Sequence, residues 1–370
     1  MQILLAIFYF FYFGIVGIYV IFMPKVLAMV EYSGSEIGII FAASPLVRFL
    51  LPFAFTKGFR LDRKFFNISL LIMLFGAIGF YFSLDSFYAL FFFNIAVGIG
   101  MSLILPYIEV IALDMVGKER YGKVRLFGSI GFVLVALVLV RFLSSPEVAL
   151  LYLLTFILFT AVLAFFIAKV VDKTNIQDKN IANDITLLAH WKLWLALALM
   201  QVSFGAFYNF FTIYETSYGV SLDMTINLWV FGVLVEIIML FFQGRLLKYN
   251  LVLILKITIF STVFRWLLVF LYPQNISILF FTQSLHALSF ALFYSAAISY
   301  LHQLYSNKVL AQQFFSGITF GLGGFVGAIM FGYIYEYFAS YIFLVASFVA
   351  SLALVSIYLW DRDTRSIIKN

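Results

Sequence analysis

Long runs of hydrophobic residues follow one another along the chain, separated by short polar segments. Each run is close to the length of about 20 residues that an α-helix needs to cross roughly 30 Å of lipid hydrocarbon. The pattern predicts an all-α membrane protein with twelve membrane-spanning helices, six before and six after a longer polar stretch. We expect the helices near residues 3–23, 36–55, 66–84, 88–113, 123–142, 148–170, 193–214, 223–243, 250–271, 276–301, 311–333 and 338–360.

The same pattern predicts how the chain is divided. We expect an N-terminal six-helix bundle at residues 1–171, a linker at 172–192 and a C-terminal six-helix bundle at 193–370. The loops after the second and eighth helices are alike, because Gly58 and Gly244 each stand beside basic residues. This similarity favours two pseudo-repeated halves, which are typical of transporters that alternate about a site near the middle of the membrane.

Composition narrows the class further. Of the 370 residues, 65% are hydrophobic and 11% are charged, whereas a soluble domain has about 25% charged residues. This excludes soluble enzymes, nucleic-acid-binding proteins and disordered proteins. The chain has no cysteine, its three histidines lack the spacing of metal ligands, and it has no phosphate-binding Gly-Lys-Ser/Thr sequence. We therefore expect no enzymatic activity, no metal, no cofactor and no nucleic-acid partner.

The basic residues predict the orientation in the membrane. Of the 23 lysines and arginines, 17 fall in one set of loops and only Lys25 and Arg141 fall in the other. Basic residues collect in cytoplasmic loops. We therefore expect both termini and the linker in the cytoplasm, with the first hydrophobic run kept as a membrane helix rather than removed as a signal peptide.

A few charged or titratable residues lie within the predicted spans, where each costs about 2.5–3.5 kcal/mol to insert. Their retention makes them candidates for function. Lys256 is near a span end and is expected to extend toward water, and Arg48 suits a structural or a functional role equally. Asp114 and Glu215 stand at span ends and are expected to be solvated. The remaining candidates are Glu109, Arg125, Glu236, Arg265 and His286.

Glu109 and Arg125 form the most suggestive pair. They flank one short turn between antiparallel spans, so they can meet at a similar depth. An ion pair would offset much of the cost of burying both charges, and the arginine fork also suits a carboxylate ligand. The alternative is a pair that only holds the two spans together. Four aromatic residues are candidates for lining a cavity: Tyr107, Tyr208, Phe211 and Tyr294.

The chain resembles the major facilitator superfamily in its two sets of six helices and in the loop Arg60-Leu61-Asp62-Arg63-Lys64. The segment YGKVRLFGSIGF at 121–132 and the segment PYIE at 106–109 are similar to the lactose permease and phenylpropionate permease groups. The resemblance implies the major facilitator fold and a bacterial inner-membrane location. It also implies that Glu109, Arg125 and Tyr107 bind substrate and that Asp62 and Arg63 belong to a gating loop.

The second half carries three further segments similar to phenylpropionate permeases: LWVFGVLVE at 228–236, FRW at 264–266 and QSLHALSF at 283–290. The resemblance implies that Glu236, Arg265 and His286 couple transport to proton movement. Lactose permease has a proton-carrying glutamate three residues after this histidine, whereas this chain has Ser289. Glu236 or Glu109 therefore remains as the proton carrier.

These expectations define a proton-coupled symporter that moves a small organic solute by alternating access. The resemblance favours an aromatic carboxylic acid such as phenylpropionate. A sugar or nucleoside symporter and a drug or metabolite efflux antiporter are alternatives, and a channel or a membrane sensor is an alternative of another class. The expected partners are the solute, protons and the lipid bilayer, with the chain acting as a monomer.

Overall fold

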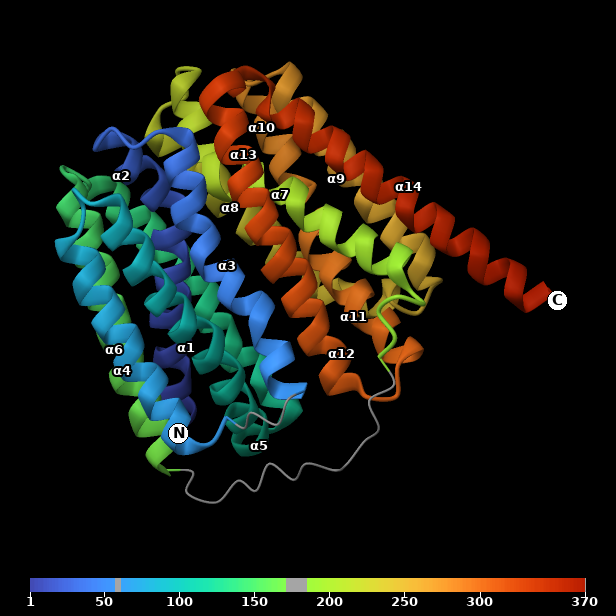
Figure 1. Cartoon of the computed structure of the whole chain (residues 1–370), viewed down its shortest axis with the longest axis horizontal. Helices are drawn as coiled ribbons and strands as arrows, with labels where there is room; N and C mark the ends of the chain where they lie inside the picture. Colours follow the sequence, from blue (N-terminus) through green and yellow to red (C-terminus); the bar gives the residue numbers. More distant parts are fainter. Residues whose placement is uncertain (57–60, 171–184, 370) are drawn as a thin grey trace. The chain divides into compact units, whose positions relative to one another are not determined.

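The computed structural model describes residues 1–56, 61–170 and 185–369 and divides the chain into two compact units, Met1–Gln177 and Asp178–Asn370. Within the described residues the regular structure is entirely helical. Each unit contains the helices of one predicted half (Figure 1). Most of the predicted linker, up to residue 184, lies outside the described residues, and Trp191 already belongs to the first helix of the second unit.

Unit 1 begins with a 28-residue apolar stretch, Gln2–Met29. A π-helical turn, η1 (Ile18–Phe22), joins its two α-helical parts, and Pro24 follows directly at the start of the second part. Proline fits the first turn of a helix because it has no backbone N–H to donate. The helices of the unit are α1 (Gln2–Gly17), α2 (Met23–Met29), α3 (Gly34–Thr56), α4 (Arg63–Phe82), α5 (Phe87–Phe142) and α6 (Pro146–Val170).

Helix α5 contains two spans, Phe87–Val116 and Lys123–Phe142, which we call its first and second limbs. In a straight helix, at 1.5 Å per residue, Glu109 and Arg125 would be separated by about 24 Å. Their side chains instead approach to 3.7 Å. The second limb therefore returns alongside the first, as expected for the fourth and fifth spans.

Unit 2 is built in the same way, with short breaks inside its longer spans. Its helices are α7 (Trp191–Ser217), α8 (Leu222–Leu246), α9 (Leu251–Leu271), α10 (Ile276–Ser284), η2 (Ala287–Leu292), α11 (Phe293–Leu304), α12 (Lys308–Phe315), η3 (Ser316–Gly323), α13 (Gly324–Phe338), η4 (Ala339–Tyr341) and α14 (Ile342–Lys369). Serine and asparagine side chains accept hydrogen bonds from backbone N–H groups at four of the N-termini, which is the usual way to start a helix. These caps are Ser221, Asn250, Asn275 and Asn307.

The described residues contain eleven helical stretches that are long and apolar enough to cross a membrane, and the last, Lys308–Thr364, has 57 residues. That length corresponds to about 85 Å of helix, far more than one crossing requires. Gly323 lies beside Ala198 of α7 and Gly327 beside Val202, so this part of the stretch runs in the same direction as α7. In α14, Phe343 packs on Phe211 of α7 and Ser356 Oγ donates to the carbonyl oxygen of Lys192, so α14 runs in the opposite direction and the stretch folds back near η4. It therefore contains both of the last two predicted spans, which accounts for the twelve expected.

Glycines allow helices to approach closely in both units. A Cβ on Gly327 of α13 would lie 2.8 Å from the carbonyl oxygen of Val202 on α7, and one on Gly205 would lie 2.6 Å from the backbone of Gly327. In unit 1, a Cβ on Gly131 would lie 2.1 Å from the carbonyl oxygen of Phe10 on α1. Small residues at such contacts let membrane helices pack closely.

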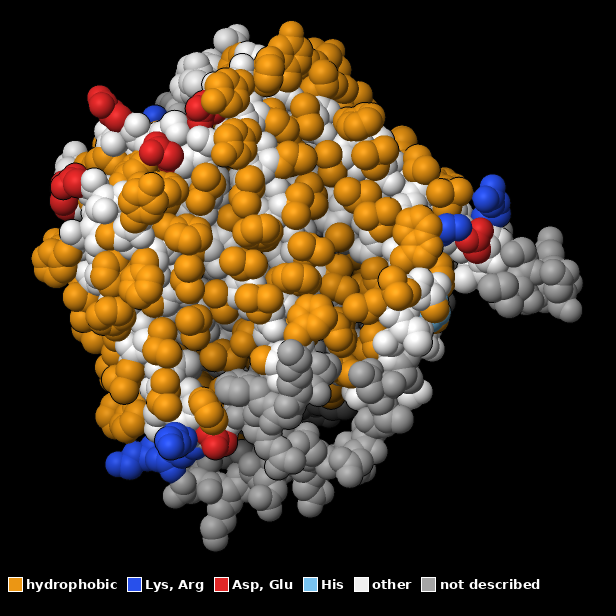
Figure 2. All heavy atoms as spheres, viewed as in Figure 1, with side chains coloured by type: hydrophobic (Ala, Val, Ile, Leu, Met, Phe, Trp, Pro, Cys, Tyr) orange, Lys and Arg blue, Asp and Glu red, His pale blue; other side chains and the backbone are white. Residues whose placement is uncertain are grey.

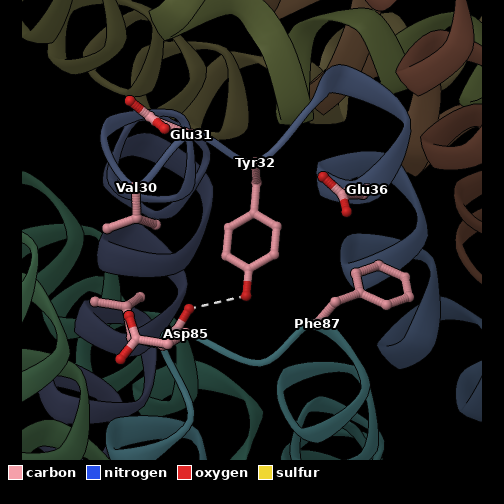
Figure 3. A pocket seen from close by; sticks show the side chains of 7 residues that line it. Val30, Glu31, Tyr32, Glu36, Asp85 and Phe87 are labelled. Atoms are coloured by element: carbon pink, nitrogen blue, oxygen red, sulfur yellow. Dashed lines mark hydrogen bonds between the residues drawn. The ribbon is translucent and has the colours of Figure 1, made fainter.

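The lipid-facing surface follows from the same pattern. Side chains such as Leu71, Phe82 and Phe241 are 66%, 79% and 76% exposed, and hydrophobic groups cover most of the face seen in Figure 2, with charged groups near the helix ends. At one end of unit 1, the Tyr32 hydroxyl donates to the carbonyl oxygen of Leu84 at 2.8 Å and joins two loops (Figure 3). Burial is the main factor that raises the pKa of the Tyr32 hydroxyl, and the nearby carboxylates of Glu36 and Asp85 raise it further. This hydroxyl therefore keeps its proton and remains a donor.

Candidate functional site

Unit 1 brings together Glu109 from the first limb of α5 and Arg125 from the second. Glu109 Oε1 lies 3.7 Å from Arg125 Nε, and the two side chains are 31% and 32% exposed. The separation is within ion-pair range but longer than a hydrogen bond. The structure thus confirms that these two residues meet, and it leaves both partly accessible.

An aromatic group from α1 and the α5 turn surrounds this pair. The Tyr121 hydroxyl donates to Glu109 Oε1 at 3.0 Å, and the Arg125 guanidinium lies 3.7 Å from the ring centre of Phe13 and 5.5 Å from that of Tyr9. Burial and the Glu109 carboxylate raise the pKa of Tyr121, so it remains a donor. Tyr121 was not predicted as a site residue, although its position four residues before Arg125 places both on one helix face.

Gly128 makes room for the guanidinium. A Cβ at this position would lie 2.6 Å from the Phe13 ring and 2.9 Å from Arg125 Nη1. Arg125 is therefore confined between α1 and the second limb of α5. Arg48 of α3 belongs to the same region, since Arg48, Glu109 and Arg125 all act electrostatically on the Tyr12 hydroxyl.

The other predicted residues of unit 1 lie elsewhere. Tyr107 stacks on Phe66 of α4 at 4.1 Å between ring centres, on a different side of the helix from Glu109 because the two are only two residues apart. Asp62 accepts from Phe65 N at 2.9 Å and caps α4, and Arg63 is the first residue of that helix. The structure does not bring these three residues to the Glu109–Arg125 pair, and residues 57–60 of the loop lie outside the described part of the chain.

Unit 2 contains a second polar cluster around Arg265 of α9, which is fully buried. Its Nη1 lies 2.8 Å from His286 Nδ1 and donates to Ser289 Oγ at 3.2 Å, while Nη2 donates to Gln283 Oε1 at 2.9 Å. Arginine has only donors, so Nδ1 of His286 must accept. The imidazole is therefore neutral and carries its proton on Nε2.

His286 connects Arg265 to Glu236 of α8. Its Nε2 lies 3.7 Å from Glu236 Oε2, and the two side chains are 8% and 22% exposed. The three residues implied in proton coupling thus form a chain in the order Arg265, His286, Glu236. Gln283, three residues before His286, is an additional member of this cluster. It lies in the segment QSLHALSF but was not predicted as a site residue.

Aromatic rings enclose this cluster. The guanidinium carbon of Arg265 lies 4.4 Å from the ring centres of both Phe207 and Trp266 and 5.8 Å from that of Phe204, and His286 stacks on Phe290 at 5.2 Å. Cation–π contacts of this kind contribute about 2 kcal/mol when the cation is desolvated. They help to explain how a buried arginine is held with neutral hydrogen-bond acceptors.

Further expectations about charged residues can be compared with the structure. Asp114 is exposed, as expected. Lys256 was expected to extend toward water, but it is buried and its Nζ pairs with Asp361 Oδ2 at 2.5 Å. That expectation was wrong. The expectation for Glu215 was also wrong: the residue is 0% exposed and neither carboxyl oxygen has a hydrogen-bond partner in the structure. Within the residues described, the structure contains no group of three or more His, Asp or Glu placed to hold a metal ion.

Comparison with known proteins agrees with this helical architecture. The pattern of the MFS_1-like family matches residues 2–345, so the chain belongs to this family of major facilitator transporters. It is 25% identical over 366 residues to a probable 3-phenylpropionic acid transporter of Escherichia coli (strain K12), covering 94% of each chain. It is 26% identical over 350 residues to the uncharacterized transporter YwbF of Bacillus subtilis (strain 168), covering 90% of this chain and 86% of YwbF.

Solved structures show the same fold. The crystal structure of the nucleoside transporter NupG matches with a TM-score of 0.77 at 16% identity, covering 97% of this chain and 98% of NupG. An inward-facing bacterial homologue of the human lysosomal transporter Spinster matches with a TM-score of 0.68 at 14% identity, covering 98% of this chain and 96% of the other. The chain is therefore a multi-pass membrane transporter with the major facilitator fold.

Proposed function

We propose that the chain is a proton-coupled symporter that imports a small aromatic carboxylic acid by alternating access. In this proposal the cluster of unit 1 binds the substrate and the cluster of unit 2 binds the proton. The chain works as a monomer in a bacterial inner membrane, with both termini in the cytoplasm.

The observation that carries the proposal is the position of Arg125. It contacts Glu109 through Nε at 3.7 Å, a loose contact that a substrate carboxylate can replace with two short charge-assisted hydrogen bonds. The rings of Phe13 and Tyr9 beside the guanidinium suit an aromatic substrate attached to that carboxylate. The E. coli relative described as a probable 3-phenylpropionic acid transporter supports this substrate class.

The chain Arg265–His286–Glu236 supports proton coupling. Because Arg265 occupies Nδ1 of His286, the imidazole directs its single N–H, on Nε2, toward Glu236. A proton added to Glu236 would remove the negative charge that attracts this N–H, and the change would pass through His286 to Arg265. Two-state coupling of this kind requires a ligand that interacts differently with two arrangements of one network. We therefore assign Glu236 as the proton carrier. Ser289, in place of a glutamate, accepts a hydrogen bond from Arg265 Nη1.

Uptake of radiolabelled 3-phenylpropionate into proteoliposomes with an alkaline interior tests the proposal. We expect saturable accumulation above the equilibrium level that collapses when the pH gradient is removed. Arg125→Lys keeps the charge but loses the fork, so we expect at least a tenfold loss of uptake at low substrate concentration. Arg141→Lys, at the far end of the same helix, is the matched control and should transport normally.

Failure of 3-phenylpropionate to accumulate in wild-type vesicles would contradict the substrate assignment. Normal uptake by Arg125→Lys would instead show that the Glu109–Arg125 pair only holds the two limbs of α5 together. Nucleosides and sugars added as competitors separate the remaining substrate classes, because only a site built for them would lose 3-phenylpropionate uptake in their presence.

A further inference from the structure

Glu215 is a buried carboxyl group that the proposed mechanism does not use. It lies in the last turn of α7, its side chain is 0% exposed, and neither Oε1 nor Oε2 has a hydrogen-bond partner. A buried carboxylate is normally paired or hydrogen-bonded, because isolating the charge from water is very costly. The Glu215 carboxyl group is therefore expected to be protonated and uncharged.

The surroundings of Glu215 offer no compensating cation. Within the described residues no charged side chain acts electrostatically on its carboxyl group. The titratable groups nearby are tyrosines: Tyr214 interacts with Glu215 and also with Tyr218 in the following turn and Tyr335 on α13. A phenol carries no positive charge in either protonation state. These tyrosines therefore provide no positive charge to hold a carboxylate.

The helix itself also opposes a negative charge here. The last turn of a helix carries the negative end of the helix dipole, and Glu215 is two residues before the end of α7 at Ser217. Its backbone carbonyl already accepts from Tyr218 N and Val220 N. Burial, the missing partners and the dipole all favour the protonated acid.

Glu215 lies on α7 between the α7–α8 turn and the cluster of unit 2. The turn from α7 to α8 begins just beyond Glu215 and includes Gly219 with a φ of +87°. Tyr208 lies seven residues earlier on the same helix face, roughly 10 Å along the axis. Tyr208 contacts Phe290, the ring on which His286 stacks.

We propose that Glu215 is a second proton-binding site of this transporter, occupied by a proton in this conformation and emptied when the α7–α8 end opens to water. This end is opposite the predicted cytoplasmic face, so the site would exchange protons with the outer compartment. Bound proton at Glu215 stabilises the closed end, and loss of the proton favours the open one. The role of the site in transport rests on the proposed function, whereas the protonation of Glu215 does not.

Infrared difference spectroscopy on the purified full-length protein tests the inference without a substrate. We expect the wild-type minus Glu215→Gln spectrum at neutral pH to contain the carbonyl band of a protonated carboxylic acid, at the high frequency of a group without hydrogen bonds. Asp114→Asn is the matched control, since Asp114 is an exposed carboxyl group near another span end. Its difference spectrum should lack that carbonyl band.

A second variant guards against misfolding, because the amide of glutamine adds donors that the site does not satisfy. Glu215→Met is apolar and of similar size, and we expect it to fold and to lose the same band. Retention of that band in both variants, or loss of carboxylate bands instead, would overturn the inference. Absence of 3-phenylpropionate uptake by the wild type would contradict the proposed function and leave the infrared result unaffected.

Discussion

Arg265 Nη1 and His286 Nδ1 lie 2.8 Å apart in the interior of unit 2, and this contact determines the protonation state of the imidazole. Since the arginine can only donate, a doubly protonated His286 would place two N–H groups against each other. In the proposed mechanism, Arg265 and Glu236 are therefore linked by a neutral histidine, and the proton binds at the carboxyl end of this chain of residues.

Substitutions of His286 test this hydrogen bond. His286→Leu leaves an N–H of a buried arginine without an acceptor, and such a loss costs about 1–3 kcal/mol. His286→Gln retains an acceptor oxygen and should lose less. Thermal unfolding of the purified protein measures both, and equal losses in the two variants would show that this bond does not hold Arg265.

Gly128→Ala tests whether the space beside Arg125 matters for substrate. The added Cβ would lie 2.9 Å from Arg125 Nη1 and 2.6 Å from Phe13, so the guanidinium must move. We expect at least a tenfold weaker affinity for 3-phenylpropionate, measured by calorimetry. Gly244→Ala is the control, because no heavy atom lies within 4 Å of its added Cβ, and unchanged binding in Gly128→Ala would remove Arg125 from the site.

Removing one partner of the buried Lys256–Asp361 pair should lower the stability of the protein more than removing both. Lys256→Met removes the cation that pairs with Asp361, and removing one partner of a buried pair costs about 3–5 kcal/mol. The double variant Lys256→Met with Asp361→Leu should recover most of that stability. A double-mutant cycle by thermal unfolding gives the coupling energy, and simple addition of the two single effects would contradict a coupled pair.

His190 predicts a stability change at mildly acidic pH. It precedes α7, its Nδ1 lies 2.7 Å from the Tyr305 hydroxyl, and burial lowers its pKa below the usual 6.5. The folded protein thus favours the neutral ring, so its contribution is complete above the unfolded pKa and is lost as pH falls below it. Melting temperatures from pH 7.5 to 5.5 should fall less in His190→Phe than in the wild type, and parallel curves would contradict this.

The pattern of hydrophobic runs predicted the helical membrane fold, because membrane insertion depends on local hydrophobicity. The orientation expected from the basic loops stays a prediction. The meeting of Glu109 with Arg125 was also predictable, since one turn separates their spans. The surroundings of Glu215 were not, because a carboxyl group at a span end looks the same in sequence whether water or packed aromatic rings cover it. The pairing of Lys256 with Asp361 was not predictable either, because the two residues lie on helices far apart in the sequence. Local hydrophobicity does not indicate such a contact.

Transport of 3-phenylpropionate by Glu236→Gln in proteoliposomes tests proton coupling most directly. Accumulation is measured in empty vesicles and exchange in vesicles loaded with unlabelled substrate. If Glu236 carries the proton, the variant should lose accumulation driven by an alkaline interior but keep exchange of labelled for unlabelled substrate, which needs no net proton movement. Asp85→Asn, an exposed carboxyl group at a loop, should retain both activities. Gradient-driven accumulation by Glu236→Gln at the wild-type level would contradict the proposal that this residue couples proton movement to transport.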